Sequence, residues 1–190
     1  FDPEPTFFEL TGQTVLLLGT GAIGKATAER LRPFGCTIIG ARRTPQVLNG
    51  FDWVVGFGEL GDILPNVDHV VSSLPMTPGT AKLFSSEMIG RMKRGAYFFN
   101  VGRGGTVDQE ALIEALVNGH LGGAGLDVTD PEPLPVDSPL WSMPNVLITS
   151  HTSGGSPKAD ERVAELAMEN IRRYCAGEDL LNLVDLEHGY

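Results

Sequence analysis

Gly19, Gly21 and Gly24 have the spacing G-x-G-x-x-G and directly follow an apolar run, Val15 to Leu18. This spacing suits the binding of phosphate groups. The first glycine permits a tight turn, the second lets the backbone approach a pyrophosphate, and the third lets the following helix pack closely. The free N–H groups and positive dipole end of a helix over residues 22–31 would then face the phosphates. The pattern predicts a dinucleotide-binding turn.

The context favours this interpretation over a glycine-rich turn that binds nothing. Val15 to Leu18 is short and uniformly apolar, as expected of a parallel strand that is covered on both faces. The segment 22–31 is compatible with a helix, Gly35 can end it, and residues 37–41 supply a second strand. The turn is therefore predicted to lie between a buried strand and a helix.

The rest of the chain continues to alternate strands with helices. Asp108 is predicted to cap an amphipathic helix that ends at Gly119 and carries Leu112, Ile113, Leu116 and Val117 on one face. Further strands are predicted at 53–55, 68–74, 97–101, 123–128 and 146–149, and further helices at 59–64, 85–92 and 158–174. This alternation predicts an α/β fold with a doubly wound parallel sheet.

Polar residues gather where the predicted strands end. Gly21 follows the first strand and Arg42 the second, while Arg103, Asp127 and His151 follow later strands. Ligands of open parallel sheets bind outside the carboxyl ends of the strands. We therefore expect one binding site at this edge. His69, His120 and His188 do not share this position, and we expect structural roles for them.

Composition excludes several classes of protein. The net charge of -10 and the pI near 4.8 argue against general nucleic-acid affinity, which needs a basic surface. No apolar segment approaches the roughly 20 residues of a membrane span, and no secretory signal is visible. Cys36 and Cys175 suggest buried thiols in a reducing cytoplasm, with a disulfide as the alternative. No spacing of histidines or cysteines predicts a metal site.

We expect a chain of this length to form one domain, with two small domains as the alternative. Residues 1–10 are rich in proline and aromatics and begin with Phe1. We interpret them as a hinge, or as the cut end of a longer protein. Residues 11–155 are predicted to form the dinucleotide-binding domain, and residues 156–190 a C-terminal helix and tail.

Five motifs in order resemble the D-isomer-specific 2-hydroxyacid dehydrogenases. They are GTGAIG at 19–24, LPMTPGT at 74–80, NVGRGGTVD at 100–108, DVTDPEP at 127–133 and HTSG at 151–154. The resemblance extends from about Leu10 to Tyr190 and implies the nucleotide-binding domain of that family. It also implies a substrate domain that is absent from this chain, and a homodimer.

The resemblance places the catalytic residues of the family at Arg103, Glu132 and His151. The chemistry calls for these residue types. A guanidinium can hold the carboxylate of a 2-keto acid and polarise its carbonyl. His151 can give a proton to the carbonyl oxygen during reduction and remove it during oxidation. A carboxylate at Glu132 would orient the imidazole ring and favour its protonated form.

The resemblance also implies the contacts to the cofactor. They run from the pyrophosphate turn, along the ribose, to the nicotinamide, where Asp127 would meet the amide. The full set is Gly19, Gly21, Ala22, Ile23, Gly24, Leu74, Pro75, Thr80, Val101, Gly102, Arg103, Asp127, His151 and Gly154.

Arg42 and Arg43 bear on the choice of cofactor. In NAD-binding members an acid stands near position 42 and hydrogen-bonds the adenosine ribose. Here no acid repels a 2′-phosphate, and either arginine could hold that phosphate. We therefore expect NADP(H) to be favoured, with NAD(H) as the alternative. The interpretation as two solvated arginines stays open.

The sequence fits two other enzyme classes poorly and leaves one binding function open. A short-chain dehydrogenase needs a Tyr-x-x-x-Lys pair, which this sequence lacks. A methyltransferase would not explain Arg103, Glu132 and His151. A dinucleotide-sensing or corepressor-like protein of the same fold, without turnover, stays open. Among substrates, glyoxylate, hydroxypyruvate and 3-phosphoglycerate are equally compatible with the sequence.

Overall fold

The computed structural model describes residues 8–186. Residues 8–150 form one compact unit and residues 151–186 a second one. Most of the predicted hinge and the end of the predicted tail, with His188, lie outside the described residues.

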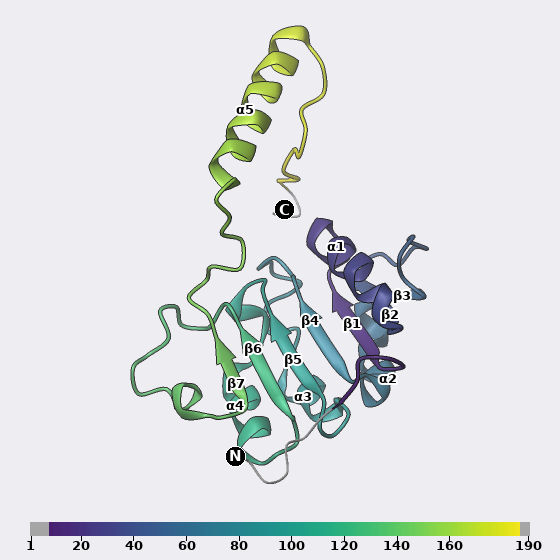
Figure 1. Cartoon of the computed structure of the whole chain (residues 1–190), viewed down its shortest axis with the longest axis vertical. Coiled ribbons are helices and arrows are strands. Elements are labelled where there is room, and N and C mark those ends of the chain that lie inside the picture. The colour runs from purple at the N-terminus through teal and green to yellow at the C-terminus, as the bar shows by residue number, and fades with distance from the viewer. Residues whose placement is uncertain (1–7, 187–190) are drawn as a thin grey trace. The chain divides into compact units, whose positions relative to one another are not determined.

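The first unit is built on one parallel sheet, shown in Figure 1. The strand order is β3-β2-β1-β4-β5-β6-β7, and every neighbouring pair is parallel. The chain turns from one half of the sheet to the other between β1 and β4, which creates a topological switch point. The prediction of a doubly wound α/β sheet is confirmed. The strands are β1 Thr14–Leu18, β2 Thr37–Arg42, β3 Trp53–Gly56, β4 His69–Ser72, β5 Tyr97–Asn100, β6 Gly123–Leu126 and β7 Val146–Ile148.

Helices cover both faces of the sheet. The first unit contains α1 Ala22–Leu31, α2 Leu60–Ile63, α3 Ser86–Arg91 and α4 Gln109–Val117. The side chains of β1 alternate between two apolar clusters. Val15 and Leu17 pack in the cluster that includes Ala28 of α1. Leu16 and Leu18 pack in the other cluster, to which α2, α3 and α4 contribute side chains. This burial on both faces explains the apolar run Val15 to Leu18 within β1.

Side chains cap the starts of α3 and α4, and the predicted cap at Asp108 is confirmed. The Ser85 hydroxyl accepts a hydrogen bond from the Met88 N–H at the start of α3. The Asp108 carboxylate accepts one from the Ala111 N–H at the start of α4. Each satisfies an N–H group that has no partner inside its helix.

The predicted apolar face of α4 is wrong at one residue. Leu112 and Leu116 are buried, but Val117 is 70% exposed, and Ala115 is buried in its place. Leu112, Ala115 and Leu116 have the spacing i, i+3, i+4, which keeps them on one face of a helix, whereas Val117 is turned about 100° further round.

The predicted helix at 59–64 is shorter than expected. The α-helical part, α2, is flanked by 3₁₀ turns at Phe57–Glu59 and Leu64–Asn66, and Pro65 lies within the second turn. Proline has no N–H group with which to continue the α-helical ladder, so it contributes to the change of helix type.

The thiols differ from the expectation in part. Cys36 is buried, and burial raises the pKa of its thiol, as expected of a core cysteine. Cys175 is exposed, so the expectation that it is buried is wrong. Both thiols are free, so they do not form the disulfide that was the alternative. The helix of Cys175, α5, carries no buried residue to shelter a thiol.

Asp68 links the strands at the amino edge of the sheet. Its carboxylate accepts hydrogen bonds from the Thr14 N–H, at 2.9 Å, and from the Lys93 ammonium. Burial raises the pKa of this carboxyl, but the bonds from Lys93 and Thr14 outweigh burial, so the pKa lies below its usual value.

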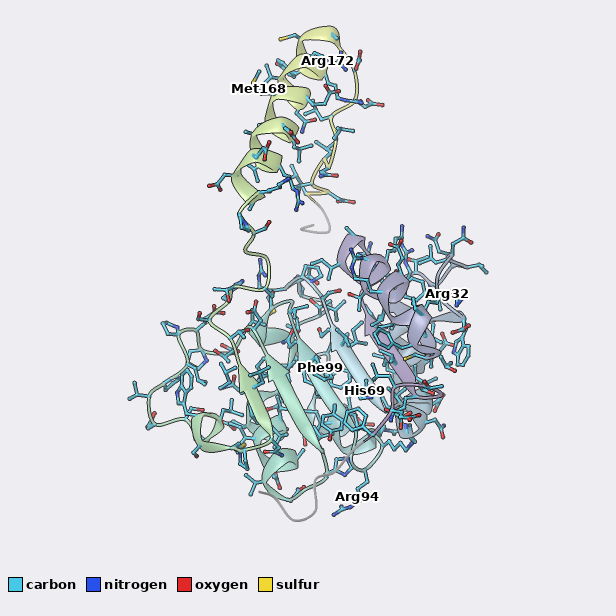
Figure 2. The ribbon with its side chains drawn as sticks, in the orientation of Figure 1. Arg32, His69, Arg94, Phe99, Met168 and Arg172 are labelled. Atoms are coloured by element: carbon cyan, nitrogen blue, oxygen red, sulfur yellow. The ribbon has the colours of Figure 1, made fainter. Side chains whose placement is uncertain are left out.

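His69 has the structural role expected of it. The ring is buried, hydrogen-bonds the Gln13 side chain and stacks on Tyr97. Figure 2 shows it next to Phe99 on the sheet, with ring centroids 6.3 Å apart. Burial lowers the pKa of His69 because it penalises the charged form.

The second unit consists mainly of α5 Ala159–Ala176. Glu169 pairs with Arg172 and Arg173, and Arg172 also pairs with Glu178 beyond the helix. The hydrogen bonds from Arg172 and Arg173 lower the pKa of Glu169 to about 2. No described helix is both long and apolar enough to cross a lipid bilayer.

Candidate active site

The glycine-rich turn after β1 has the geometry that its spacing predicts. Gly19 has a positive φ of 94°, and its N–H donates to the Ala41 carbonyl of β2 at 2.9 Å. A Cβ at Gly24 would lie 2.0 Å from the Gly19 carbonyl oxygen, so only glycine lets α1 start this close to the turn. A Cβ at Gly21 would meet nothing within 4 Å. Gly21 therefore leaves its space to whatever approaches the turn.

The N-terminus of α1 is open to a ligand. Gly21 occupies the cap position without a side-chain cap, and no acidic residue lies in the first turn. Ala22 and Ile23 are exposed, Ile23 by 55%. Uncapped N–H groups at a ten-residue helix form a favourable place for an anion. The residues present therefore fit a pyrophosphate.

The loop after β4 is held in shape by Thr80. Its hydroxyl donates to the Pro75 carbonyl at 2.6 Å and accepts from the Thr77 N–H at 2.9 Å. Thr80 is buried, as is Leu74, while Pro75 is half-buried. Since these bonds engage its hydroxyl, Thr80 shapes the loop on which Leu74 and Pro75 are presented.

The loop after β5 carries Arg103 and is fixed by Asn100. The buried Asn100 amide donates to the Arg103 carbonyl and accepts from the Gly102 N–H, both at 3.0 Å. The Arg103 carbonyl also accepts from the Thr106 hydroxyl at 2.7 Å. The Arg103 backbone is therefore held from both sides, while its side chain is exposed. Val101, just before this turn, is half-buried.

Sequence reasoning missed Asn100 and Thr106 as supports of the site. The signal was present, because an asparagine directly before a tight turn commonly bonds the backbone two residues on. Asn100 occupies that position before Gly102.

The Arg103 loop is wedged between the loops that follow β4 and β6. A Cβ at Gly102 would lie 2.5 Å from the Leu74 carbonyl oxygen, and one at Gly104 would lie 2.0 Å from the Thr129 carbonyl oxygen. Both glycines therefore permit backbone contacts that any other residue would break. The structure brings Arg103 together with the predicted ribose-side loop on one side and with the Asp127–Glu132 segment on the other.

Asp127 follows β6 directly. Its side chain is buried and accepts a hydrogen bond from the Thr149 hydroxyl after β7, and its N–H donates to the Asn100 carbonyl at 3.0 Å. Glu132 lies further along this loop and is exposed. Asp127 thus belongs to the carboxyl edge that carries Arg103.

Arg42 and Arg43 lie where predicted, at the end of β2. Arg42 is the last residue of the strand, pairs with Gly56 of β3 and is half-buried, whereas Arg43 is exposed. β2 neighbours β1, so both arginines lie at the carboxyl edge one strand away from the glycine-rich turn.

His151 and Gly154 belong to the second unit. His151 has a positive φ of 54° and is exposed, and a Cβ at Gly154 would meet nothing within 4 Å. The structure groups Arg103, Asp127 and Glu132 in the first unit, and the placement of His151 beside them stays a prediction. No group of three or more potential metal ligands occurs within residues 8–186.

The strand order, the glycine-rich turn and the uncapped helix together define a dinucleotide-binding domain of the doubly wound class. Residues 2–153 match the family described as "D-isomer specific 2-hydroxyacid dehydrogenase, NAD binding domain", and the chain belongs to this family.

Among curated relatives, a chloroplastic/mitochondrial formate dehydrogenase of Arabidopsis thaliana is 37% identical over 90% of this chain and 45% of its own length. A glyoxylate reductase of Korarchaeum cryptofilum is 36% identical over 95% of this chain and 54% of its own length. The chain thus spans about half the length of the curated relatives it matches.

Among solved structures, a D-isomer specific 2-hydroxyacid dehydrogenase from Xanthobacter autotrophicus Py2, in complex with NADPH and MES, is 43% identical. It superposes with a TM-score of 0.87 over 94% of this chain and 73% of its own chain. This structural similarity agrees with the doubly wound sheet described above.

Proposed function

We propose that the full protein transfers a hydride between NAD(P)H and a small 2-keto or 2-hydroxy acid of D configuration. The observation that carries this proposal is the position of Arg103. Its backbone is fixed by Asn100 between the Leu74 loop and the Thr129 segment, and its guanidinium is exposed at the carboxyl edge. A guanidinium carried on a fixed backbone at the same sheet edge as the dinucleotide turn is suited to hold the carboxylate of a keto acid next to the nicotinamide.

Each residue of the site then has a separate task. A dinucleotide held by this turn would supply a hydride to C2 of the keto acid or accept one from C2 of the hydroxy acid. Arg103 holds the substrate carboxylate and stabilises negative charge on the carbonyl oxygen. During reduction His151 gives its proton to that oxygen, and during oxidation it takes the proton back. The family resemblance gives Glu132 the task of orienting the His151 ring.

NADP(H) is the cofactor we favour. Arg42 and Arg43 stand at the end of β2, where an acid would otherwise meet the adenosine ribose. The similar protein from Xanthobacter was crystallised with NADPH, which supports this choice. NAD(H) remains the alternative cofactor.

The proposal extends to the domain organisation, the oligomeric state and the location of the full protein. We infer that a substrate domain, mainly preceding this chain, closes the site, that the protein forms a homodimer, and that it works in the cytoplasm. Residues 11–155 would then be the dinucleotide-binding domain. Residues 156–190 would be its C-terminal helix and tail. The chain alone should bind dinucleotide but turn over keto acids poorly, because hydride transfer needs an enclosed, water-poor cleft.

The test is a panel of acids assayed with NADPH and NADH on the full-length protein. Glyoxylate, hydroxypyruvate and the keto acid derived from 3-phosphoglycerate are offered for reduction. Formate is offered for oxidation because a relative is a formate dehydrogenase. Turnover of a keto acid supports the proposal. Tight dinucleotide binding without turnover of any acid would instead indicate a dinucleotide-sensing protein. Oxidation of formate alone would show that formate, and not a 2-hydroxy acid, is the substrate.

The role of His151 is tested by His151→Ala in the same protein. General acid–base catalysis typically contributes about 10²- to 10⁴-fold, so the catalytic rate should fall by that order while dinucleotide affinity changes little. An unchanged rate across the pH range would exclude His151 as the proton donor.

A further inference from the structure

A second pocket lies between α3 and α4, away from the dinucleotide turn. Its volume is about 430 Å³, within the range of sites for small molecules. Arg94 and His120 line one end and come shortly before β5 and β6, so this end lies near the amino edge of the sheet. The dinucleotide turn lies at the carboxyl edge. The pocket is therefore separate from the proposed catalytic site.

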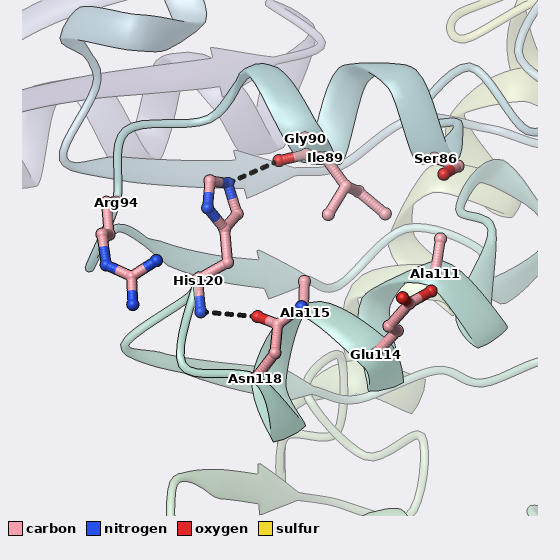
Figure 3. A pocket seen from close by; sticks show the side chains of 9 residues that line it. All are labelled: Ser86, Ile89, Gly90, Arg94, Ala111, Glu114, Ala115, Asn118 and His120. Carbon is pink, nitrogen blue, oxygen red and sulfur yellow. Dashed lines mark hydrogen bonds between the residues drawn. The ribbon is translucent and has the colours of Figure 1, made fainter.

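The two ends of the pocket carry opposite charges. Figure 3 shows the Arg94 guanidinium and the His120 ring at one end and the Glu114 carboxylate and Ser86 hydroxyl at the other. Within residues 8–186, neither the Arg94 guanidinium nor the Glu114 carboxylate has a hydrogen-bond or ion-pair partner. Some charged groups elsewhere on this domain are paired, as Asp68 is with Lys93 and Glu87 with Arg91. Both pocket charges are thus available to a ligand.

His120 is held in place by two hydrogen bonds. Its Nε2 lies 3.1 Å from the Ile89 carbonyl oxygen, which can only accept, so Nε2 carries the proton. Its backbone N–H donates to the Asn118 side chain at 2.8 Å (Figure 3). His120 therefore connects α3 to the end of α4.

The middle of the pocket is apolar and has room. Ile89 and Ala115 are buried core residues that form part of its wall. Gly90 also lines it, and a Cβ there would meet nothing within 4 Å. Glu114 and Asn118 are one helical turn apart on α4, which separates the two ends by about 6 Å along the helix.

We propose that this pocket binds a small zwitterion whose carboxylate and ammonium lie several bonds apart, such as an ω-amino acid or a dipeptide. The carboxylate binds Arg94 beside His120. The ammonium binds Glu114 and the Ser86 hydroxyl, and the carbon chain between them packs on Ile89. This site does not depend on the proposed function of the carboxyl edge.

The test is a titration of the chain with 6-aminohexanoate, in which binding is measured by calorimetry and by changes in amide chemical shifts. Shifts should concentrate on Gly90, Asn118 and His120. Hexanoate and hexylamine, which each lack one charge, should bind more weakly. Glu114→Gln and Arg94→Gln should each lower the affinity for 6-aminohexanoate by roughly fivefold to tenfold. This loss lies between the typical contributions of an exposed ion pair and of a charge-assisted hydrogen bond.

Gly90→Leu should abolish binding of 6-aminohexanoate because its side chain fills the open space. Gly58→Leu is the matched control. Gly58 is also exposed, has nothing within 4 Å of a Cβ and lies outside the pocket. Gly90→Leu should keep dinucleotide binding, which shows that the variant is folded. The proposal is overturned if 6-aminohexanoate causes no shifts at the pocket, if hexanoate binds equally well, or if folded Gly90→Leu binds like the unchanged chain.

Discussion

Gly21 and Gly24 should respond differently to the same added methyl group. In Gly24→Ala the new Cβ would lie 2.0 Å from the Gly19 carbonyl oxygen, whereas real Cβ contacts are not shorter than 3.0 Å. The start of α1 must therefore move away from the turn. Overpacking typically costs about 1 to 3 kcal/mol, and a clash with rigid backbone belongs at the upper end. For a domain of this size, about 3 kcal/mol corresponds to a Tm that is roughly 6 to 12 °C lower.

Gly21→Ala should leave the fold nearly unchanged. The site has an ordinary φ of -74° and nothing within 4 Å of the new Cβ. Alanine is a poorer helix cap than glycine, but it also restricts the unfolded chain, and these two effects largely cancel. We expect a change in stability within about 0.5 kcal/mol. The methyl group would instead occupy the space of the pyrophosphate, so NADPH affinity should fall by roughly tenfold or more, the effect of about 1.4 kcal/mol.

The assay is thermal unfolding by circular dichroism together with NADPH titration by fluorescence, on both variants. Gly24→Ala should lose stability and affinity together, whereas Gly21→Ala should lose affinity alone. Equal destabilisation of the two variants would refute the steric argument. Unchanged NADPH affinity in Gly21→Ala would refute the assignment of the turn to the pyrophosphate.

Three further predictions concern the core, the pH dependence and the cofactor. Leu116→Ala should destabilise the chain by about 2 to 5 kcal/mol and its exposed neighbour Val117→Ala by less than about 0.5 kcal/mol, as measured by urea unfolding. The pKa of Asp68 is lowered on folding, so its stabilising contribution is complete above its unfolded pKa of about 4 and is lost as the pH falls through the folded value. Unfolding curves of Asp68→Asn and the unchanged chain should therefore converge in acid, and a constant gap at every pH would contradict this. Arg42→Ala should lower the affinity for NADPH by roughly tenfold to a hundredfold and leave the affinity for NADH nearly unchanged. If the ratio of the two affinities does not change, Arg42 does not determine the choice of cofactor.

The sequence was most informative where one physical requirement governs one residue. Residues 15–18 of β1 are buried on both faces of the sheet, so they had to be apolar, and Gly24 touches backbone, so no side chain fits there. Asp108 was recognisable because a helix start leaves N–H groups that a short acidic side chain can satisfy.

The sequence was least informative where the outcome depends on contacts from distant segments. Hydrophobicity alone did not show that Val117 points to solvent while Ala115 packs inside. Cys175 lies on a helix whose burial the local pattern does not determine. The position of Asn100 before a turn signals its bond to the Gly102 N–H, but its second bond, to the Arg103 carbonyl, is seen only in the structure. His151 stands in a separate unit, so its partnership with Glu132 stays a prediction.

The contacts of Gly102 and Gly104 have a consequence for protein engineering. The loops after β4, β5 and β6 touch through backbone atoms at these two glycines, with no side chain between them to absorb a change. A loop grafted from a relative would keep its own backbone path and would collide with the two loops that remained. Exchanges that aim to alter substrate choice near Arg103 should therefore move all three loops as one block.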